Sequence, residues 1–339
     1  MLTQCQSIGV CRNRLGYLRM TDRYPLPSSC APFVSLVMST RNRARKLDAC
    51  LGAIEKLTCR LAWEVIVVDN GSADETPRLL DEFSVCAKMS VTVAREAKPG
   101  LSRALNRALE LARGKIIVFS DDDCYPSPDL LDRTLEAMEQ RRLDYMGGRI
   151  ELFDADDAPI TIQTELQPLD IPPMTYIRPG LLQGCNMAVR RTVFDRIGLF
   201  DPLMGAGGLF RSSGDVDFLQ RASLAGFVGG YAPSALTFHH HGRRGADVSQ
   251  LRRRYAVGRG AFYAKILLLN PRFAFRLLCE RRASAGTTIG LLKTVYWALR
   301  RDVMNAPWVA VGFIGCAIVF PSVKLVAGLR PLLLRRNAN

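Results

Sequence analysis

The sequence lacks the glycine-rich loops with which many nucleotide-binding proteins hold phosphate groups. The turn after the first predicted strand reads STRNRARK, without a glycine, and no Walker A sequence occurs in the 339 residues. A Rossmann dinucleotide site needs G-x-G-x-x-G at that turn, because glycine lets the backbone approach the pyrophosphate. The sequence therefore argues against a Rossmann oxidoreductase and a P-loop NTPase. Another device must hold any nucleotide, such as a metal that bridges carboxylates to a diphosphate.

Paired cysteines and a secretory leader are also missing. The ten cysteines form no CxxC pair and have no regular spacing. They indicate reduced core residues in a cytoplasmic protein and imply no zinc site. Residues 1–31 carry several arginines but no continuous apolar stretch, which predicts a poorly ordered leader and no signal peptide.

Negative charge is scarce in the last hundred residues. From His239 to Asn339, 18 Lys and Arg stand against 3 Asp and Glu, while the whole chain carries a net charge of +14. Residues 303–323 contain no charge and are long enough to cross a bilayer. We therefore expect residues 243–339 to be helical, basic and membrane-associating, on the cytoplasmic face of the inner or plasma membrane. A buried helix is the alternative, and nucleic acid is not an expected partner.

Strands and helices are predicted to alternate from residue 32 onward. Apolar strands are expected within residues 33–43, 63–76, 90–97 and 115–123, and helical periodicity occupies residues 46–57 and 101–114. This β-α-β-α-β pattern predicts an α/β fold, a Rossmann-like and mostly parallel sheet flanked by helices. We expect residues 32–242 to form the catalytic domain, followed by the helical extension.

Polar side chains follow three of these strands where each strand ends. They are Thr40 and Asn42, Asp69 and Asn70, and the triplet Asp121, Asp122 and Asp123. Ligands of open α/β sheets collect at the carboxyl ends of the strands. Oxygen ligands there suit Mg²⁺ or Mn²⁺ together with substrate phosphates. In an extended chain Asp121 and Asp123 share a face and Asp122 points away; the alternative is a helix cap, for which Ser127 or Asp129 would suffice.

Four segments in order resemble the family 2 inverting glycosyltransferases of the GT-A fold. They are VDNGSADET, FSDDDCYPSPDLL, GCNMAVRRTVFDRIGLFDP and SSGDVDFLQRASLAGF, and the similarity covers residues 33–241. The resemblance implies a DxD-type enzyme that binds a nucleotide-sugar donor with Mn²⁺ or Mg²⁺.

The resemblance also implies roles for individual residues. Asp215 would be the general base, with Asp217 as its rival because Gly214 replaces the family's glutamate. Asp123, Asp121 and His239 would hold the metal, with His241 as the alternative histidine and His240 pointing away. Gly184 and Asn186 would lie on the acceptor side. The donor nucleotide would be bound by Thr40, Asn42, Asp69, Asn70, Asp121, Asp122 and Lys98. Lys98 or Arg103 would replace an arginine that the family often has on the helix after the third strand.

A further segment is similar to the Q-x-x-R-W motif of processive polysaccharide synthases, but departs from it. Gln250 and Arg253 are present, whereas Arg254 stands where the motif has tryptophan. We therefore expect a non-processive glycosyltransferase that moves one sugar from a nucleotide sugar to a hydroxyl of a saccharide or lipid-linked acceptor. A sugar nucleotidyltransferase and a non-catalytic nucleotide-sugar binding protein are the alternatives.

Overall fold

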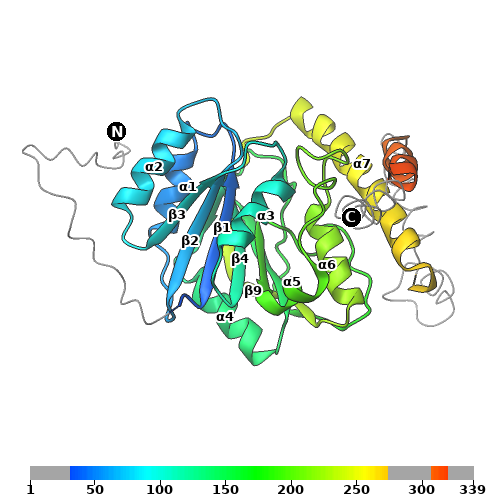
Figure 1. The fold of residues 1–339 in the computed structure, drawn as a ribbon, viewed down its shortest axis with the longest axis horizontal. Coiled ribbons are helices and arrows are strands. Elements are labelled where there is room, and N and C mark those ends of the chain that lie inside the picture. Colours follow the sequence, from blue (N-terminus) through cyan, green and yellow to red (C-terminus); the bar gives the residue numbers. More distant parts are fainter. Residues whose placement is uncertain (1–30, 274–306, 320–339) are drawn as a thin grey trace, which may run out of the picture.

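The computed structural model describes residues 31–273 and 307–319, and in these residues nine strands form one sheet (Figure 1). The strands are β1 (Val34–Thr40), β2 (Trp63–Asp69), β3 (Ser90–Arg95), β4 (Ile116–Asp121), β5 (Cys124–Pro126), β6 (Tyr145–Leu152), β7 (Leu169–Ile171), β8 (Asn186–Arg190) and β9 (Gly229–His239). The helices are α1 (Leu47–Ile54), α2 (Thr76–Cys86), α3 (Leu101–Leu111), α4 (Leu130–Gln140), α5 (Arg191–Ile197), α6 (Gly214–Leu224) and α7 (Ala246–Leu269), and residues 307–319 are also helical. The predicted leader lies outside the described residues, apart from its last one.

The strand order is β3-β2-β1-β4-β8-β6-β9-β5, and β7 pairs with β9. Strands β3, β2, β1 and β4 are parallel neighbours. Strand β8 runs antiparallel between β4 and β6, and β9 is parallel to β6. Most strands thus point the same way, and the predicted mostly parallel α/β sheet is confirmed.

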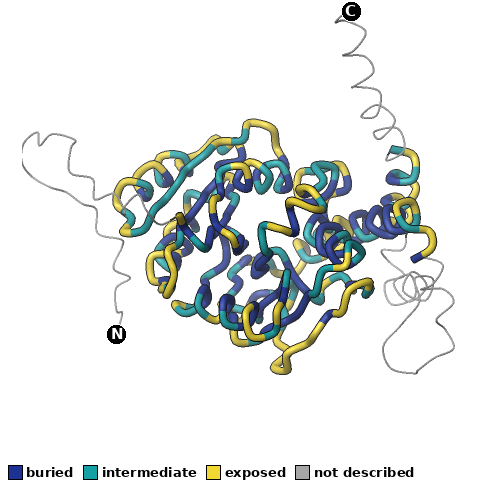
Figure 2. Tube along the Cα trace, turned by 60° about the horizontal axis from the view of Figure 1, so that its bottom comes forward, coloured by how far each residue is buried: buried dark blue, intermediate teal, exposed yellow. Residues whose placement is uncertain are grey.

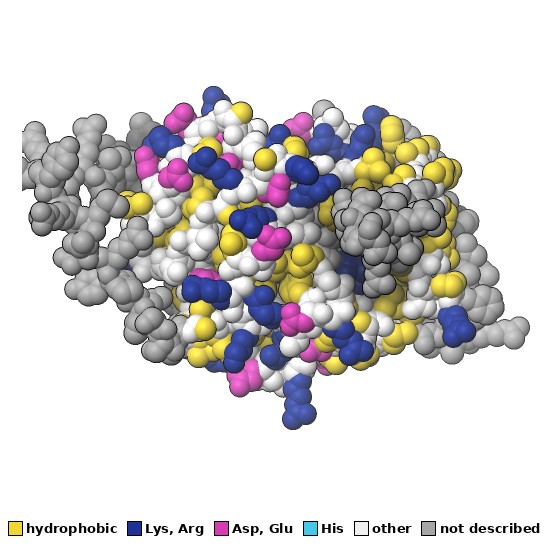
Figure 3. Space-filling model, in the orientation of Figure 1, with side chains coloured by type: hydrophobic (Ala, Val, Ile, Leu, Met, Phe, Trp, Pro, Cys, Tyr) yellow, Lys and Arg dark blue, Asp and Glu magenta, His cyan; other side chains and the backbone are white. Residues whose placement is uncertain are grey.

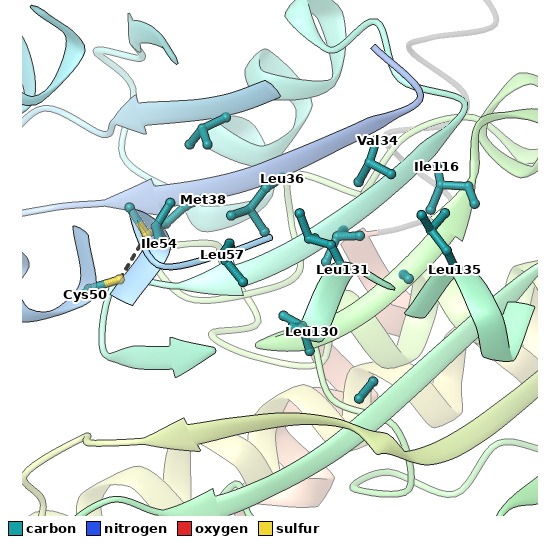
Figure 4. Packing of buried hydrophobic residues seen from close by; sticks show 14 of the residues in the cluster. Val34, Leu36, Met38, Cys50, Ile54, Leu57, Ile116, Leu130, Leu131 and Leu135 are labelled. Carbon is teal, nitrogen blue, oxygen red and sulfur yellow. Dashed lines mark hydrogen bonds between the residues drawn. The ribbon is translucent and has the colours of Figure 1, made fainter. Parts of the chain in front are cut away.

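The first strands are almost continuously apolar because helices cover both of their faces. Leu36 and Met38 of β1 pack with α1, α2 and α4. The Cys50 thiol lies 3.6 Å from the Met38 sulfur, and Figure 4 shows the two residues within this layer. Val37 points to the other face, where α3, α5 and α6 complete a second core. Figure 2 shows buried residues in the interior of the trace and exposed residues toward its outside. Burial on both faces explains the missing apolar-polar alternation.

Helix α7 and residues 307–319 form a third apolar cluster beside α6 (Figure 1). Glycines allow the two helices to approach closely. A Cβ on Gly312 would lie 1.8 Å from the carbonyl oxygen of Val257, and one on Gly260 would lie 1.9 Å from that of Val309. Within the described ranges, no helix combines the length and the apolar character that crossing a bilayer requires. The predicted uncharged run of residues 303–323 is described only in part.

Candidate active site

The ends of β1, β2 and β4 lie side by side at one edge of the sheet. Thr40 is paired with Asp69, and Ser39 is paired with Asp121, so the polar residues after these strands meet as the sequence predicts. Helix α4 begins directly after Asp129, which leaves the aspartate triplet outside that cap. The hydroxyl of Thr40 is buried at this edge, next to Asp122.

The expected alternation of the aspartate triplet is wrong beyond Asp121. Strand β4 ends there, and residues 122–123 form a turn before β5. As a result, Asp122 and Asp123 contact the same guanidinium: Arg43 places Nε 3.1 Å from Oδ1 of Asp122 and donates from Nη2 to Oδ2 of Asp123 at 3.0 Å. The side-chain period of two applies only to extended chain, and a turn removes it.

Asp123 also contacts the first of the three histidines. The Nε2 of His239, at the end of β9, lies 3.2 Å from Oδ1 of Asp123. Burial alone would raise the pKa of Asp123, but the hydrogen bond with His239 and the charges of His239 and Arg43 lower it to about 2. Burial opposes the charged form of His239 as well, and Asp123 outweighs this and raises the imidazole pKa.

The other two histidines have different partners. His240 points away from the aspartates, as predicted, because its Nδ1 lies 2.9 Å from the hydroxyl of Tyr125. His241 lies next to His239, with ring centroids 5.0 Å apart. Its Nε2 is 3.0 Å from the carbonyl oxygen of Ala158 and its Nδ1 accepts the N–H of Arg243. These contacts favour His239 over His241 as the histidine of the aspartate site.

Asp121 lies among carboxylates. Burial and the neighbouring charge of Asp123 raise its pKa to about 7, and Asp122 and Asp215 add to the shift. Two carboxylates in a buried site cannot both ionise cheaply unless a cation joins them. The cluster of carboxylate oxygens with an imidazole nitrogen is therefore a donor set that fits Mn²⁺ or Mg²⁺.

Several predicted donor residues brace the neighbouring loops through their side chains. The amide of Asn70 donates to the carbonyl oxygens of Glu96 and Lys98 and accepts the N–H of Gly100. The side-chain oxygen of Asn42 accepts the N–H of Ala73 at 2.8 Å. These amides hold the loops at the edge of the sheet.

Asp69 is the last residue of β2, and Lys98 follows β3. Oδ1 of Asp69 accepts the N–H of Ser72 at 3.0 Å, so this carboxylate is oriented by the turn that follows β2. Lys98 is exposed, and its backbone N–H donates to the carboxylate of Glu96 at 2.7 Å.

The rival carboxylates of α6 have different surroundings. Asp217 is buried and ion-paired, with Lys265 Nζ 2.6 Å from Oδ1 and Arg221 Nε 3.1 Å from Oδ2. Asp215 accepts the backbone N–H groups of Gly184 and Val216, each at 2.9 Å. Asp215 lines a pocket of about 340 Å³, and burial raises its pKa. A carboxylate in a pocket, held by the main chain, suits proton abstraction better than one that neutralises two cations.

Helix α7 contributes two side chains to this pocket that the sequence analysis missed. Tyr255 and Arg259, four residues apart on one face of α7, line it together with Asp215. The hydroxyl of Tyr255 lies 3.2 Å from that of Thr161. The motif's tryptophan is absent at position 254, and the neighbouring Tyr255 lines the pocket.

The two residues predicted for the acceptor side are placed by their polar contacts. Gly184 donates its N–H to Asp215, so it lies beside the base candidate. Asn186 is buried and donates its amide to the carbonyl oxygens of Arg149 and Ala235. Gly184 therefore orients Asp215 through its backbone, and the amide of Asn186 ties β8 to β6 and β9.

One cluster near the site was not expected from the cysteine spacing. The sulfurs of Cys124 and Cys185 and a ring nitrogen of His239 lie within 4.8 Å of one another, and all three residues are buried. The hydrogen bond from Cys124 lowers the thiol pKa of Cys185, but burial together with the charges of Asp121, Asp123 and Asp215 outweighs it and raises the pKa. Burial also raises that of Cys124. Both cysteines are thus protonated and pack as small apolar groups.

Comparison with known proteins identifies the family. Residues 35–198 match the model of glycosyl transferase family 2. Glycosyltransferase AglE of Haloferax volcanii is 26% identical over 238 residues, which are 69% of this chain and 74% of that protein. A PGL/p-HBAD biosynthesis glycosyltransferase of Mycobacterium tuberculosis is 34% identical over 102 residues, which are 30% of this chain and only 40% of the relative.

Solved structures share the fold at low sequence identity. The mannosyltransferase PcManGT from Pyrobaculum calidifontis, in complex with GDP-Man and Mn²⁺, has a TM-score of 0.56 and 21% identity, covering 90% of this chain and 81% of that chain. TarS of S. aureus, residues 1–349, in complex with UDP-GlcNAc, has a TM-score of 0.52 and 17% identity, covering 86% of this chain and 91% of that chain.

The mixed sheet, with carboxylates collected where its parallel strands end, is a GT-A fold. Residues 35–198 form a glycosyltransferase family 2 domain, and the chain is a glycosyltransferase. The predicted family and enzyme class are confirmed, and the nucleotidyltransferase and non-catalytic alternatives are set aside.

Proposed function

We propose that this glycosyltransferase moves one sugar from a nucleoside diphosphate sugar to an acceptor hydroxyl, with inversion and with the help of a divalent metal. The observation that carries the proposal is that two carboxylate sites of the structure have different surroundings. Asp123 pairs with His239 at the end of the sheet, while Asp215 lines the pocket and is held by main-chain N–H groups. The first arrangement suits a diphosphate-bound cation and the second suits a general base.

In this proposal, Asp215 removes the proton of the acceptor hydroxyl as its oxygen attacks the anomeric carbon of the donor. The bond from that carbon to the diphosphate oxygen breaks on the opposite face, so the configuration inverts and the nucleoside diphosphate leaves. The main-chain hydrogen bonds to both oxygens of Asp215 fix its orientation. Its raised pKa makes it a stronger base than an ordinary carboxylate.

Asp123, His239 and Asp121 would hold Mn²⁺ or Mg²⁺, which when bound neutralises charge on the departing diphosphate. The raised pKa of Asp121 and the oxygen-rich donor set support this assignment. PcManGT contains Mn²⁺ together with GDP-Man, which adds a precedent on the same fold. The donor nucleotide would lie along Thr40, Asn42, Asp69, Asn70, Asp122 and Lys98, at the ends of β1, β2 and β4.

The acceptor would enter the pocket beside Asp215. Its lining combines apolar side chains, such as Ile162 and Leu182, with Tyr255 and Arg259. Gly184 orients Asp215 through its N–H, whereas Asn186 holds the strands beside it together. An aromatic ring suits a sugar face, and a guanidinium suits a negatively charged group, so a saccharide or a lipid-linked saccharide is the proposed acceptor.

The region beyond residue 242 would hold the enzyme at the cytoplasmic face of a membrane, next to the catalytic region 32–242. The helix of residues 307–319 exposes an apolar face: Val311 and Ile314 are 54% and 58% exposed. Figure 3 shows hydrophobic side chains gathered at the end of the molecule where α7 and this helix lie. Replacing both residues by serine should reduce sedimentation with phosphatidylglycerol vesicles; unchanged sedimentation would contradict membrane contact through this face.

A screen of nucleotide sugars tests the function. In the presence of Mn²⁺, slow hydrolysis of one donor should release its nucleoside diphosphate, which identifies the donor before the acceptor is known. Asp123→Ala should abolish the metal-dependent binding of that nucleoside diphosphate. Asp81→Ala, a control at a carboxylate that is 64% exposed, should leave the binding unchanged. Equal affinity in Asp123→Ala and the wild type would refute the metal assignment.

A further inference from the structure

The guanidinium of Arg43 lies in the carboxylate site, and the proposed function gives it no role. Arg43 lies in the loop between β1 and α1, and its guanidinium contacts both Asp122 and Asp123, at 3.1 and 3.0 Å. The backbone N–H of Arg43 donates to the hydroxyl of Thr76 at 2.9 Å, which fixes the loop. The side chain remains 28% exposed. The main chain is therefore held while the guanidinium borders solvent.

Both oxygens of Asp123 are already engaged. Arg43 contacts Oδ2, and His239 contacts Oδ1 at 3.2 Å. A cation that coordinates Asp123 must therefore compete with a fixed positive charge. An arginine binds phosphate at least as well as carboxylate, so a diphosphate oxygen can replace Asp123 as the partner of the guanidinium. That alternative partner is present only when a diphosphate is bound.

We propose that Arg43 is an internal counter-ion that makes metal binding depend on the donor diphosphate. Without ligand, its guanidinium neutralises Asp122 and Asp123. When a metal and a diphosphate bind together, the guanidinium moves from Asp123 to a diphosphate oxygen and leaves that carboxylate to the metal. The inference rests on the proposed function, in which Asp123 holds the metal. The coupling is reciprocal, so each ligand tightens the other.

Replacing Arg43 by glutamine tests the exchange, with Mn²⁺ and inorganic pyrophosphate as probes. Binding of Mn²⁺ alone is measured by the electron paramagnetic resonance signal of free Mn²⁺, and binding of pyrophosphate at saturating Mn²⁺ by calorimetry. Arg43→Gln should bind Mn²⁺ alone about ten-fold more tightly and pyrophosphate about ten-fold more weakly, which is within the usual range of coupling between two sites. Arg45→Gln, an exposed arginine of the same loop, should match the wild type.

The affinities for Mn²⁺ alone and for pyrophosphate distinguish this exchange from a role of Arg43 as an ordinary phosphate ligand. If Arg43→Gln loses pyrophosphate affinity but binds Mn²⁺ alone no more tightly than the wild type, Arg43 is an ordinary phosphate ligand and the inference is wrong. Arg43→Lys keeps the charge without the fork that joins two carboxylates, so its Mn²⁺ affinity should lie between the other two. A lysine variant that binds Mn²⁺ more tightly than the glutamine variant would also overturn the inference. If wild-type protein binds pyrophosphate equally well without Mn²⁺, the proposed metal site itself fails.

Discussion

The backbone N–H of Gly184 donates a 2.9 Å hydrogen bond to Oδ2 of Asp215, joining the loop before β8 to the first turn of α6. The other oxygen of the carboxylate accepts the N–H of Val216. Main-chain donors stabilise the charged form of Asp215 from the side of the backbone. This leaves room for an acceptor hydroxyl next to the carboxylate.

Replacing Asp215 by asparagine should separate binding from turnover. Asparagine nearly preserves the shape but cannot take a proton, so donor turnover should fall by at least about 100-fold, the usual contribution of a general base. Affinity for the nucleoside diphosphate with Mn²⁺ should stay within about two-fold, well under the 1.4 kcal/mol that a ten-fold change represents. Calorimetry and steady-state assays with the donor found by the screen measure both quantities.

Asp217→Asn is the matched comparison, two residues along the same helix. It removes the shared partner of Arg221 and Lys265, so it should lower stability and leave the chemistry of Asp215 in place. If turnover collapses in Asp217→Asn but persists in Asp215→Asn, the base has been assigned to the wrong carboxylate.

The pH dependence of turnover should carry the signature of Asp215. Burial raises the pKa of Asp215 above the value of about 3.9 that is typical of an aspartate, so its carboxyl group stays protonated to a higher pH. The base is active only when ionised, so kcat/KM should rise with pH through this raised pKa. The residual activity of Asp215→Asn should lack this acid limb. An identical limb in the wild type and the variant would assign the titration to another group.

The sequence predicts the parts of the site that depend on local pattern. Each apolar strand and the polar residues at its end are contiguous, so the edge with Thr40, Asp69 and Asp121 follows from the alternation of elements. The distinction between Asp215 and Asp217 could not be predicted, because it depends on Lys265, which α7 brings across the fold. The alternation of the triplet failed because a turn begins at Asp122. Tyr255 was missed because the motif comparison concerned its neighbour.

The ion pairs of Lys265 should matter for stability. Its Nζ lies 2.6 Å from Asp217 and 2.8 Å from Asp201, and all three side chains are largely buried. Replacing Lys265 by methionine keeps most of the volume but removes one charge, and breaking a buried pair in this way costs roughly 3–5 kcal/mol. Urea unfolding followed by circular dichroism measures the loss. Arg252→Met, at an exposed position of the same helix, should change the free energy of unfolding little. Equal losses in the two variants would show that the buried ion pairs of Lys265 do not stabilise the fold.

The helix of residues 307–319 offers a controlled test of close packing. A Cβ on Gly312 would meet the Val257 carbonyl oxygen at 1.8 Å, whereas one on Gly315 would meet only a ring carbon of Phe210 at 3.5 Å. Alanine normally stabilises a helix by roughly 0.5–1 kcal/mol relative to glycine. Gly315→Ala should therefore be neutral or stabilising, while Gly312→Ala should push the helix away from α7 and raise hydrogen exchange in residues 307–319. Because both variants add one methyl group to the same helix, equal exchange in the two would contradict the close contact with α7.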